Sequence, residues 1–307
     1  MLKIIVLGTA AGGGVPQWNC NCAGCKAARE RPELVNTQAS VAVSADDRNW
    51  FLINASPDIR QQINATQQLH PSDGQIRHSP IAGVILTNGE VDAVAGLLNL
   101  REGSPFTVYG HDRVLSVLEG NSIFNVLHRD LVPRQRIEID AAFEPELQDG
   151  TSSGLTVEAF EVPGKPAWYL EGTAEETDNA PGDTIGLHIR ETDGAKGFFF
   201  IAACGQITDA LKQRIDGAPL VFFDGTLWRD DEMIAAGLSH KTGQRMGHVS
   251  ISGGEGALAR LADLDIARKL FVHINNSNPV LRPQSDERRQ IEAAGWRIPT
   301  IGEEIVL

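Results

Sequence analysis

Short apolar segments that end in polar residues recur along this chain of 307 residues, and this pattern constrains the fold most. Each segment has the length and composition of a buried β-strand. We predict strands at 2–7, 40–44, 50–54, 81–87, 107–109, 155–162, 185–190, 197–202, 220–223, 269–273 and 304–307. We predict helices at 92–100, 114–119, 209–216, 253–261 and 286–294. Two runs of strands with interspersed helices indicate packed sheets covered by helices rather than one doubly wound sheet.

Length and charge set limits on the rest. With 307 residues and 42% hydrophobic content, the chain can bury a large core, as one large domain or two small ones. We find no repeat, low-complexity tract or linker rich in proline or serine. A net charge of −13, with scattered lysines and arginines, disfavours nucleic acid as a partner.

The beginning of the chain predicts a cytoplasmic protein. The segment MLKIIVLGTAAGGG has one early lysine and a short apolar run that a glycine turn follows at once, which is too short for the core of a signal peptide. No apolar run reaches the ~18 residues of a membrane span, so we predict none.

Three of the four cysteines lie within six residues, as Cys20, Cys22 and Cys25. In a reducing compartment such a cluster binds metal more often than it reacts or merely packs, and the spacing suits a structural zinc. The fourth ligand is left open. Cys204, at the end of the apolar run 198–204, is interpreted as a small buried hydrophobic residue instead.

Polar side chains follow four predicted elements, at the places where α/β proteins keep their chemistry. Glu90 and Asp92 follow the strand at 81–87, Asp224 follows that at 220–223, and His273 ends that at 269–273. His248 precedes a predicted helix. Each has a structural alternative: helix caps for Asp92 and His248, turn chemistry for Asp224, and a hydrogen-bonded strand-edge histidine for His273. Together, carboxylates and imidazoles suit Mn, Fe or Zn.

The order of these strand ends resembles the metallo-β-lactamase superfamily, in which a His-x-His-x-Asp-His motif follows a buried strand. Asn88, Glu90 and Ala93 stand at the three histidine positions, and Asp92 matches the aspartate. His273 matches a late metal-binding histidine. The resemblance therefore implies that Asp92 and His273 bind a metal, with Glu90 as the expected further ligand.

Two more segments resemble parts of the superfamily. Gly-His-Val-Ser at 247–250 is similar to the Gly-His-Ser-Thr segment of the tRNase Z branch, which implies that His248 is a proton donor beside the metal, with Asp224 close by. Gln206 stands where hydrolytic members have the aspartate that bridges two metals. One metal with few protein ligands would leave open positions for substrate and O2, as in non-haem iron sites.

The closer resemblance is to the coenzyme PQQ synthesis protein B family. It covers essentially the whole chain and rests on long, unusual segments at 8–14, 16–22, 54–59, 100–103, 223–228 and 273–276. It implies an α/β chain of the α+β type, folded as a four-layer αββα sandwich with a single domain over 1–307. The metal site is expected at the ends of the two sheets.

The family resemblance also implies a function in the biosynthesis of pyrroloquinoline quinone (PQQ). The activity ascribed to the family is iron-dependent, O2-using hydroxylation of the tyrosine ring in a cross-linked Glu–Tyr unit from the precursor peptide. Mn or Zn could replace the iron in a crystal. The alternative is a non-catalytic carrier that helps move PQQ or a precursor toward the periplasm. The sequence does not separate these two functions, because polar strand ends serve either.

The resemblance also gives the cysteine cluster a role. Zinc at Cys20, Cys22 and Cys25 would pin an otherwise irregular surface loop at 16–26, which in relatives supports a homodimer. Asn276 stands where zinc-bearing relatives have a histidine. An amide is a poor zinc ligand, so water, another side chain or a partner subunit remain open as the source of the fourth ligand.

Overall fold

Two mixed β-sheets form the centre of the protein. The computed structural model describes residues 1–171, 180–194 and 196–307. In that part of the chain, the first sheet has seven strands: β14 (Glu304–Val306), β1 (Lys3–Gly8), β2 (Ser40–Ser44), β3 (Trp50–Ile53), β4 (Ile81–Ile85), β5 (Thr107–Gly110) and β6 (Arg134–Arg136). The second also has seven: β13 (Trp296–Arg297), β12 (Lys269–Val272), β11 (Val221–Asp224), β10 (Gly197–Ile201), β9 (Ile185–Glu191), β8 (Leu155–Glu161) and β7 (Ala142–Phe143).

The two sheets share one pattern of strand directions. In the first, β14, β1, β2 and β3 pair antiparallel, and β3 to β6 pair in parallel. In the second, β7 to β10 pair antiparallel, and β10 to β13 pair in parallel. The carboxyl ends of parallel strands meet at one edge of a sheet. Polar residues after β4 therefore lie at that edge of the first sheet, and those after β11 and β12 lie at that edge of the second.

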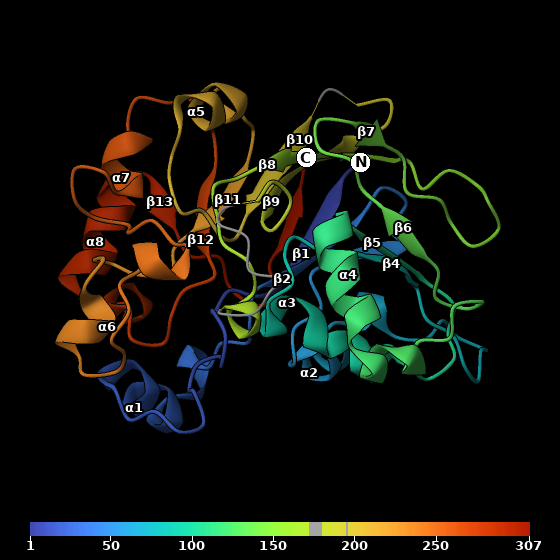
Figure 1. The fold of residues 1–307 in the computed structure, drawn as a ribbon, viewed down its shortest axis with the longest axis horizontal. Helices are drawn as coiled ribbons and strands as arrows, with labels where there is room; N and C mark the ends of the chain where they lie inside the picture. The colour runs from blue at the N-terminus through green and yellow to red at the C-terminus, as the bar shows by residue number, and fades with distance from the viewer. Residues whose placement is uncertain (172–179, 195) are drawn as a thin grey trace.

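Apolar side chains form three core layers. One lies between the sheets and includes Val41, Phe51, Leu187 and Phe222, all fully buried. A second covers the outer face of the first sheet beneath α2 (Ile59–Ala65) and α4 (Asp112–Gly120). A third covers the outer face of the second sheet, beneath the remaining helices of the C-terminal half. Figure 1 shows these helices on the two outer sides, so the predicted four-layer αββα sandwich is confirmed.

Three of the predicted helices agree with the structure within two residues at each end. These are α4, α5 (Asp209–Ile215) and α8 (Asp286–Ala293). The structure adds elements that the patterns do not predict, namely α1 (Ala23–Glu30), α2, α6 (Glu232–Ala235) and the short strands β6, β7 and β13. Most of these are short, and the three strands lie at sheet edges, where burial imposes little periodicity.

Two predicted helices are wrong in extent. The segment 92–100 is split into α3 (Val91–Val94) and a 3-10 helix (Ala95–Leu100). The α-helical ladder stops because the Gly96 N–H donates to the Ala55 carbonyl, 2.8 Å away. The segment 253–261 is helical only over α7 (Ala257–Arg260), since glycines, one of them with a φ of 91° at Gly253, begin it. His248 therefore does not begin a helix.

The cysteine loop is more regular than predicted. It is irregular up to Cys22, whose sulfur accepts a hydrogen bond from the Cys25 N–H at the beginning of α1. A cysteine at this position caps the helix as a serine would, and residues 23–26 of the 16–26 segment are helical. Over the described ranges, no helix has both the length and the hydrophobicity needed to cross a bilayer.

Candidate active site and cysteine cluster

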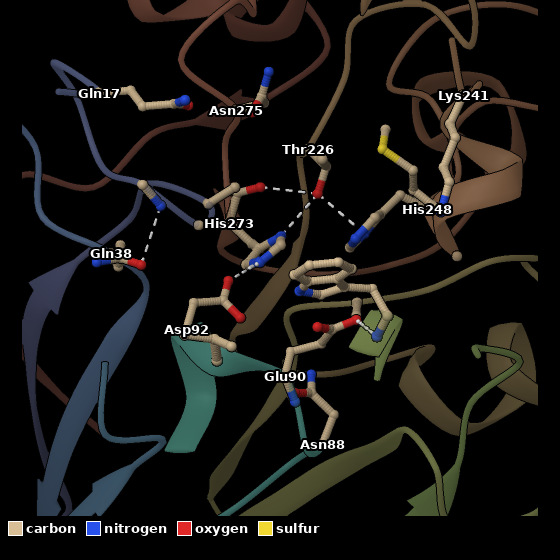
Figure 2. A pocket seen from close by; sticks show the side chains of 18 of the residues that line it. Gln17, Gln38, Asn88, Glu90, Asp92, Thr226, Lys241, His248, His273 and Asn275 are labelled. Atoms are coloured by element: carbon tan, nitrogen blue, oxygen red, sulfur yellow. Dashed lines mark hydrogen bonds and ion pairs between the residues drawn. The ribbon is translucent and has the colours of Figure 1, made fainter. Parts of the chain in front are cut away.

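The polar strand ends meet around a pocket of about 830 Å³. Residues that follow β4, β11 and β12 line it, together with residues from the cysteine loop and from the segment around residue 165. Figure 2 shows Asp92, His273, Thr226 and His248 in a row across this pocket. The structure thus brings together side chains that lie up to 181 residues apart in the chain.

Asp92 and His273 form an ion pair in the pocket. Nε2 of His273 lies 2.8 Å from Oδ2 of Asp92, which is in the first turn of α3. His273 has a φ of 56°, a left-handed conformation that non-glycine residues rarely adopt and that is found at functional sites. Asp92 thus contacts His273 rather than serving only as a helix cap.

Burial and the contact between Asp92 and His273 shift the pKa of each group in opposite directions. Burial alone would lower the pKa of His273, but the hydrogen bond and charge of Asp92 raise it above its ordinary value. Burial alone would raise the pKa of Asp92, but the hydrogen bond from His273 lowers it. Both shifts favour the charged forms of the pair, in which a nitrogen and an oxygen face each other.

Asp224 and His248 form a second pair beside the first. Asp224 is fully buried at the end of β11, and its Oδ2 lies 2.7 Å from Nδ1 of His248. The same oxygen accepts from the Cys204 N–H at 2.9 Å. Its other oxygen accepts from the N–H of Thr226 at 2.9 Å and from its hydroxyl at 2.6 Å. Four hydrogen bonds hold this carboxylate, which keeps Nδ1 of His248 directed at it.

Distance alone would also suggest a metal site at Asp224, His248 and His273, since one possible ligand atom of each lies within 4.8 Å of the others. The hydroxyl of Thr226 lies among these atoms, 2.8 Å from Nδ1 of His273 and 3.1 Å from Nδ1 of His248. The space is thus filled by a side chain. Asp92 and His273 stay the predicted metal ligands.

Glu90 precedes Asp92 by two residues, and its side chain bonds to the segment around residue 165. Its Oε1 accepts from the Trp168 N–H at 3.0 Å and lies 3.4 Å from Nζ of Lys165. Burial raises the pKa of Glu90, and the neighbouring Asp92 adds to this, while Lys165 opposes it. Both of these bonds are made by Oε1. Glu90 stays a predicted ligand.

The three departures from the superfamily motif have different structural roles. Asn88 lines the pocket, and its Oδ1 accepts from the Glu90 N–H at 3.0 Å. Ala93 is buried in the core beneath the first sheet. Gln206 is exposed and does not line the pocket. No second metal with the usual bridging carboxylate can be assembled from these three residues.

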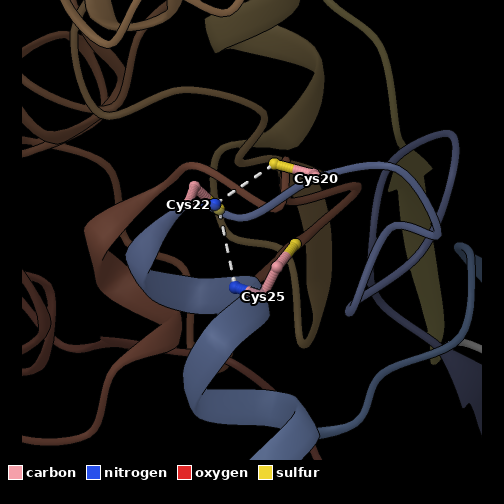
Figure 3. A group of neighbouring side chains, drawn as sticks. All are labelled: Cys20, Cys22 and Cys25. Carbon is pink, nitrogen blue, oxygen red and sulfur yellow. Dashed lines mark hydrogen bonds between the residues drawn. The ribbon is translucent and has the colours of Figure 1, made fainter.

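The three clustered cysteines bring their sulfurs within 4.8 Å of one another (Figure 3). The backbone N–H of Cys22 donates to Sγ of Cys20 at 3.5 Å, and the N–H of Cys25 donates to Sγ of Cys22 at 3.5 Å. Burial would raise the pKa of Cys20, but hydrogen bonds from Cys22 lower it, whereas burial raises the pKa of Cys22 to about 11. Such a group of thiols can hold a metal once it is deprotonated.

Asn276 contacts the same cluster from the other half of the chain. Its side-chain amide donates to Sγ of Cys25 at 3.2 Å, and its backbone carbonyl accepts from Sγ of Cys22 at 3.3 Å. Asn276 is three residues after His273, so the cysteine cluster supports the loop that carries the pocket histidine. Cys204 is fully buried in the core, as predicted, and burial raises its pKa.

Sequence reasoning missed several residues of this pocket. Trp18 and Trp168 line it with 87% and 60% of their surface exposed, which is unusual for such large apolar side chains. Lys165 and Lys241 line it too, and both pair with Glu171, at 3.1 and 2.6 Å. No periodic pattern indicates these residues, because they lie outside the predicted strand ends.

Thr226 was missed for another reason. It directly follows Asp224 and Gly225 at the end of a strand, in a segment whose aspartate was considered and whose threonine was not. Asp-Gly-Thr is a sequence typical of ordinary turns, so it gave no reason to assign Thr226 to a site.

The chain is similar to proteins of known family. The sequence model of a β-lactamase superfamily domain matches residues 49–274. A coenzyme PQQ synthesis protein B from Bradyrhizobium diazoefficiens is 65% identical over 309 residues, covering 100% of both chains. The crystal structure of Zn(2+)-bound PqqB from Methylobacterium extorquens is 48% identical, with a TM-score of 0.92 over 99% of this chain and 100% of that one. A diphosphatase from the PhnP family, 20% identical with a TM-score of 0.66, covers 99% of this chain and 96% of its own and shares the fold.

Proposed function

Because this chain belongs to the coenzyme PQQ synthesis protein B family, within the metallo-β-lactamase superfamily, we propose that it hydroxylates a tyrosine-derived ring during PQQ biosynthesis. The substrate is the cross-linked Glu–Tyr unit from the precursor peptide, and the reaction uses iron and O2. The observation that supports this best is the facing pair of Asp92 and His273 in a pocket of about 830 Å³.

This pair fits one iron ion. The nitrogen and oxygen lie 2.8 Å apart, close to the separation of neighbouring ligands held at about 2.1 Å from a metal. Imidazole and carboxylate are the ligands of non-haem iron sites, and Oε2 of Glu90 would be a further one. A bound iron ion would supply the activation of O2, which side chains alone do not provide.

The chain's own residues would bind and orient the substrate. The pocket is large enough for a small aromatic molecule, and the exposed ring of Trp168 is suited to pack against a phenol ring. Trp168 is anchored by its backbone bond to Glu90, which links the ring contact to the predicted metal ligand.

His248 would move a proton in this pocket. Because Nδ1 faces the carboxylate of Asp224 at 2.7 Å, Nε2 is the nitrogen left to exchange a proton with substrate. Asp224 holds that tautomer and orientation. The centroids of the His248 and His273 rings lie 5.0 Å apart. His248 would therefore carry its proton beside the predicted metal ligands without binding the metal itself.

We assign a structural zinc to Cys20, Cys22 and Cys25. Three sulfurs within 4.8 Å of one another suit a tetrahedral site, and Asn276 closes one side of it. The zinc would hold the loop of residues 16–26 for a homodimer.

The test is aerobic turnover of the purified Glu–Tyr substrate with ferrous iron. One oxygen atom should enter the ring, while the other leaves as water with two electrons from an added reductant such as ascorbate. Product mass and oxygen uptake report the reaction, with anaerobic and iron-free mixtures as controls. The variant His273→Ala should lose both the iron and the product. A carrier would bind the substrate without consuming oxygen, and that result, or full turnover by His273→Ala, would contradict the proposal.

A further inference from the structure

The hydroxyl of Thr226 occupies the centre of the polar network between the two histidines. Its Oγ1 lies 2.6 Å from Oδ1 of Asp224, 2.8 Å from Nδ1 of His273 and 3.1 Å from Nδ1 of His248 (Figure 2). It also lies 2.9 Å from the carbonyl oxygen of His273. A hydroxyl has one proton to donate and two lone pairs to accept with, so these contacts must be divided between the two roles.

The proton of Thr226 can be assigned from its shortest contact. Oδ1 of Asp224 and the carbonyl of His273 are acceptors only, so both compete for the one proton of the hydroxyl. The carboxylate at 2.6 Å is the closer and the more strongly accepting of the two, so the hydroxyl donates to it. The proton is therefore not available to Nδ1 of the His273 ring.

This assignment determines the state of the His273 ring. Since Thr226 donates elsewhere, Nδ1 of His273 must be the donor in the 2.8 Å contact with Oγ1. Nε2, the nitrogen that faces Asp92, is then the one that would give up its proton and offer its lone pair to a metal. The ring is thus held with its metal-binding nitrogen directed at the carboxylate oxygen of the other predicted ligand.

Thr226 is itself held firmly in place. It is 4% exposed, and its N–H donates to Asp224. Its carbonyl accepts from the N–H of Asn275 at 3.0 Å and from the amide of Asn278 at 3.3 Å. Both of these residues belong to the segment after His273, so the backbone that carries His273 and the hydroxyl that orients its ring are connected.

We propose that Thr226 is a positioning residue that fixes the tautomer of His273 and thereby the nitrogen that binds the active-site metal. The same hydroxyl joins the Asp92–His273 pair to the Asp224–His248 pair through one shared oxygen. The inference rests on the proposed metal site at Asp92 and His273. A partner of this kind, bonded to the nitrogen that does not bind metal, typically changes metal affinity by about 10–100-fold.

The first measurement compares Thr226→Val, which keeps the shape and removes the hydroxyl, with Thr226→Ser, which keeps the hydroxyl. Mn²⁺ is the probe, because it prefers nitrogen and oxygen ligands and does not compete for the thiols, and the cysteine cluster is filled with zinc beforehand. Free Mn²⁺ is measured by its EPR signal in a titration of the full chain. We expect Thr226→Val to bind Mn²⁺ about 10–100-fold more weakly, and Thr226→Ser to stay within about threefold of the unaltered chain.

The second measurement needs no variant. In the chain loaded with zinc at the Asp92–His273 site, long-range ¹H–¹⁵N spectra of the histidine rings should show a protonated Nδ1 and a metal-bound Nε2 for His273. An unprotonated or metal-bound Nδ1 would overturn the proposal, as would Mn²⁺ affinity in Thr226→Val within threefold of the unaltered chain. If Thr226→Val does not fold, the spectra decide alone.

The failure of this inference can be told from failure of the metal site. If His273→Ala leaves Mn²⁺ binding unchanged, the assignment of the metal ligands is wrong, and the role of Thr226 is lost with it. If His273→Ala abolishes binding while Thr226→Val does not weaken it, the ligands stand and only the positioning role is wrong.

Discussion

The substitution Asp224→Asn replaces one oxygen of a fully buried carboxylate by an NH2 group and tests the network directly. Each oxygen of Asp224 accepts one backbone N–H, from Cys204 or from Thr226, at 2.9 Å. Each oxygen also accepts from a side chain, His248 or the Thr226 hydroxyl. A histidine or a hydroxyl can reverse its role and accept a hydrogen bond, but a backbone N–H cannot.

In either orientation of the new amide, one buried backbone N–H therefore faces an NH2 group. An unpaired buried donor costs about 1–3 kcal/mol, and the remaining bonds lose the strengthening given by a charged acceptor. We expect a loss of about 2–5 kcal/mol in the free energy of unfolding. For a chain of 307 residues this corresponds to a fall in melting temperature of roughly 3–8 °C. Turnover should fall as well, since either orientation changes the proton on His248 or on Thr226.

The assay is thermal unfolding followed by circular dichroism, with turnover measured at a temperature where the variant is folded. Asp130→Asn is the matched control, because it makes the same chemical change at a side chain that is 89% exposed. It should stay within about 0.5 kcal/mol of the unaltered chain. An Asp224→Asn chain that melts with the control, or that keeps full turnover, would refute the hydrogen-bond assignment.

Three further predictions concern other parts of the chain. His248→Ala should keep its active-site metal and lose turnover, as metal analysis and product formation would show; loss of the metal as well would make it a ligand. Cys22→Ser should release about one zinc per chain and weaken the dimer in sedimentation, whereas Cys204→Ala should keep the zinc; an intact dimer without zinc would rule out the dimer role. Burial would raise the pKa of Glu303, but hydrogen bonds from Arg297 lower it below its ordinary value. The charged Glu303 therefore contributes to the free energy of unfolding above the unfolded pKa of about 4.3, and this contribution is lost as pH falls through the lower folded pKa. Glu303→Gln should thus destabilise by roughly 1 kcal/mol at pH 7. Its melting temperature should approach that of the unaltered chain as pH falls through the lower folded value, and a difference independent of pH would contradict this.

The strands of the sandwich were predicted well because the pattern that identifies a strand lies within the strand itself. Strands such as β2 and β12 are short apolar runs with polar ends, and this pattern depends only on burial of each segment. Helices that begin at good caps, such as α5 after Thr208, were also predicted. The pattern failed where a long-range contact overrides propensity, as at Gly96, whose N–H bonds to the Ala55 carbonyl.

The sequence also indicated which side chains would carry the chemistry, since Asp92, Asp224, His248 and His273 all follow or flank buried segments. It could not indicate which atoms meet. That Asp92 faces His273 while Asp224 faces His248 depends on how two sheets place the ends of β4, β11 and β12. The residues at the end of a strand do not reveal which neighbouring strand end their side chains will bond to.

Only the tertiary structure showed which atoms Thr226, Trp168 and Asn276 contact, although the resemblance had already singled out Asn276. Each acts through partners distant in the chain: Trp168 bonds to Glu90 over 78 residues, and Asn276 contacts Cys25 over 251. No local pattern selects such residues, because threonine, tryptophan and asparagine are common in loops without a function. Their significance comes from hydrogen bonds made across a buried space, and those form only when both sheets are packed.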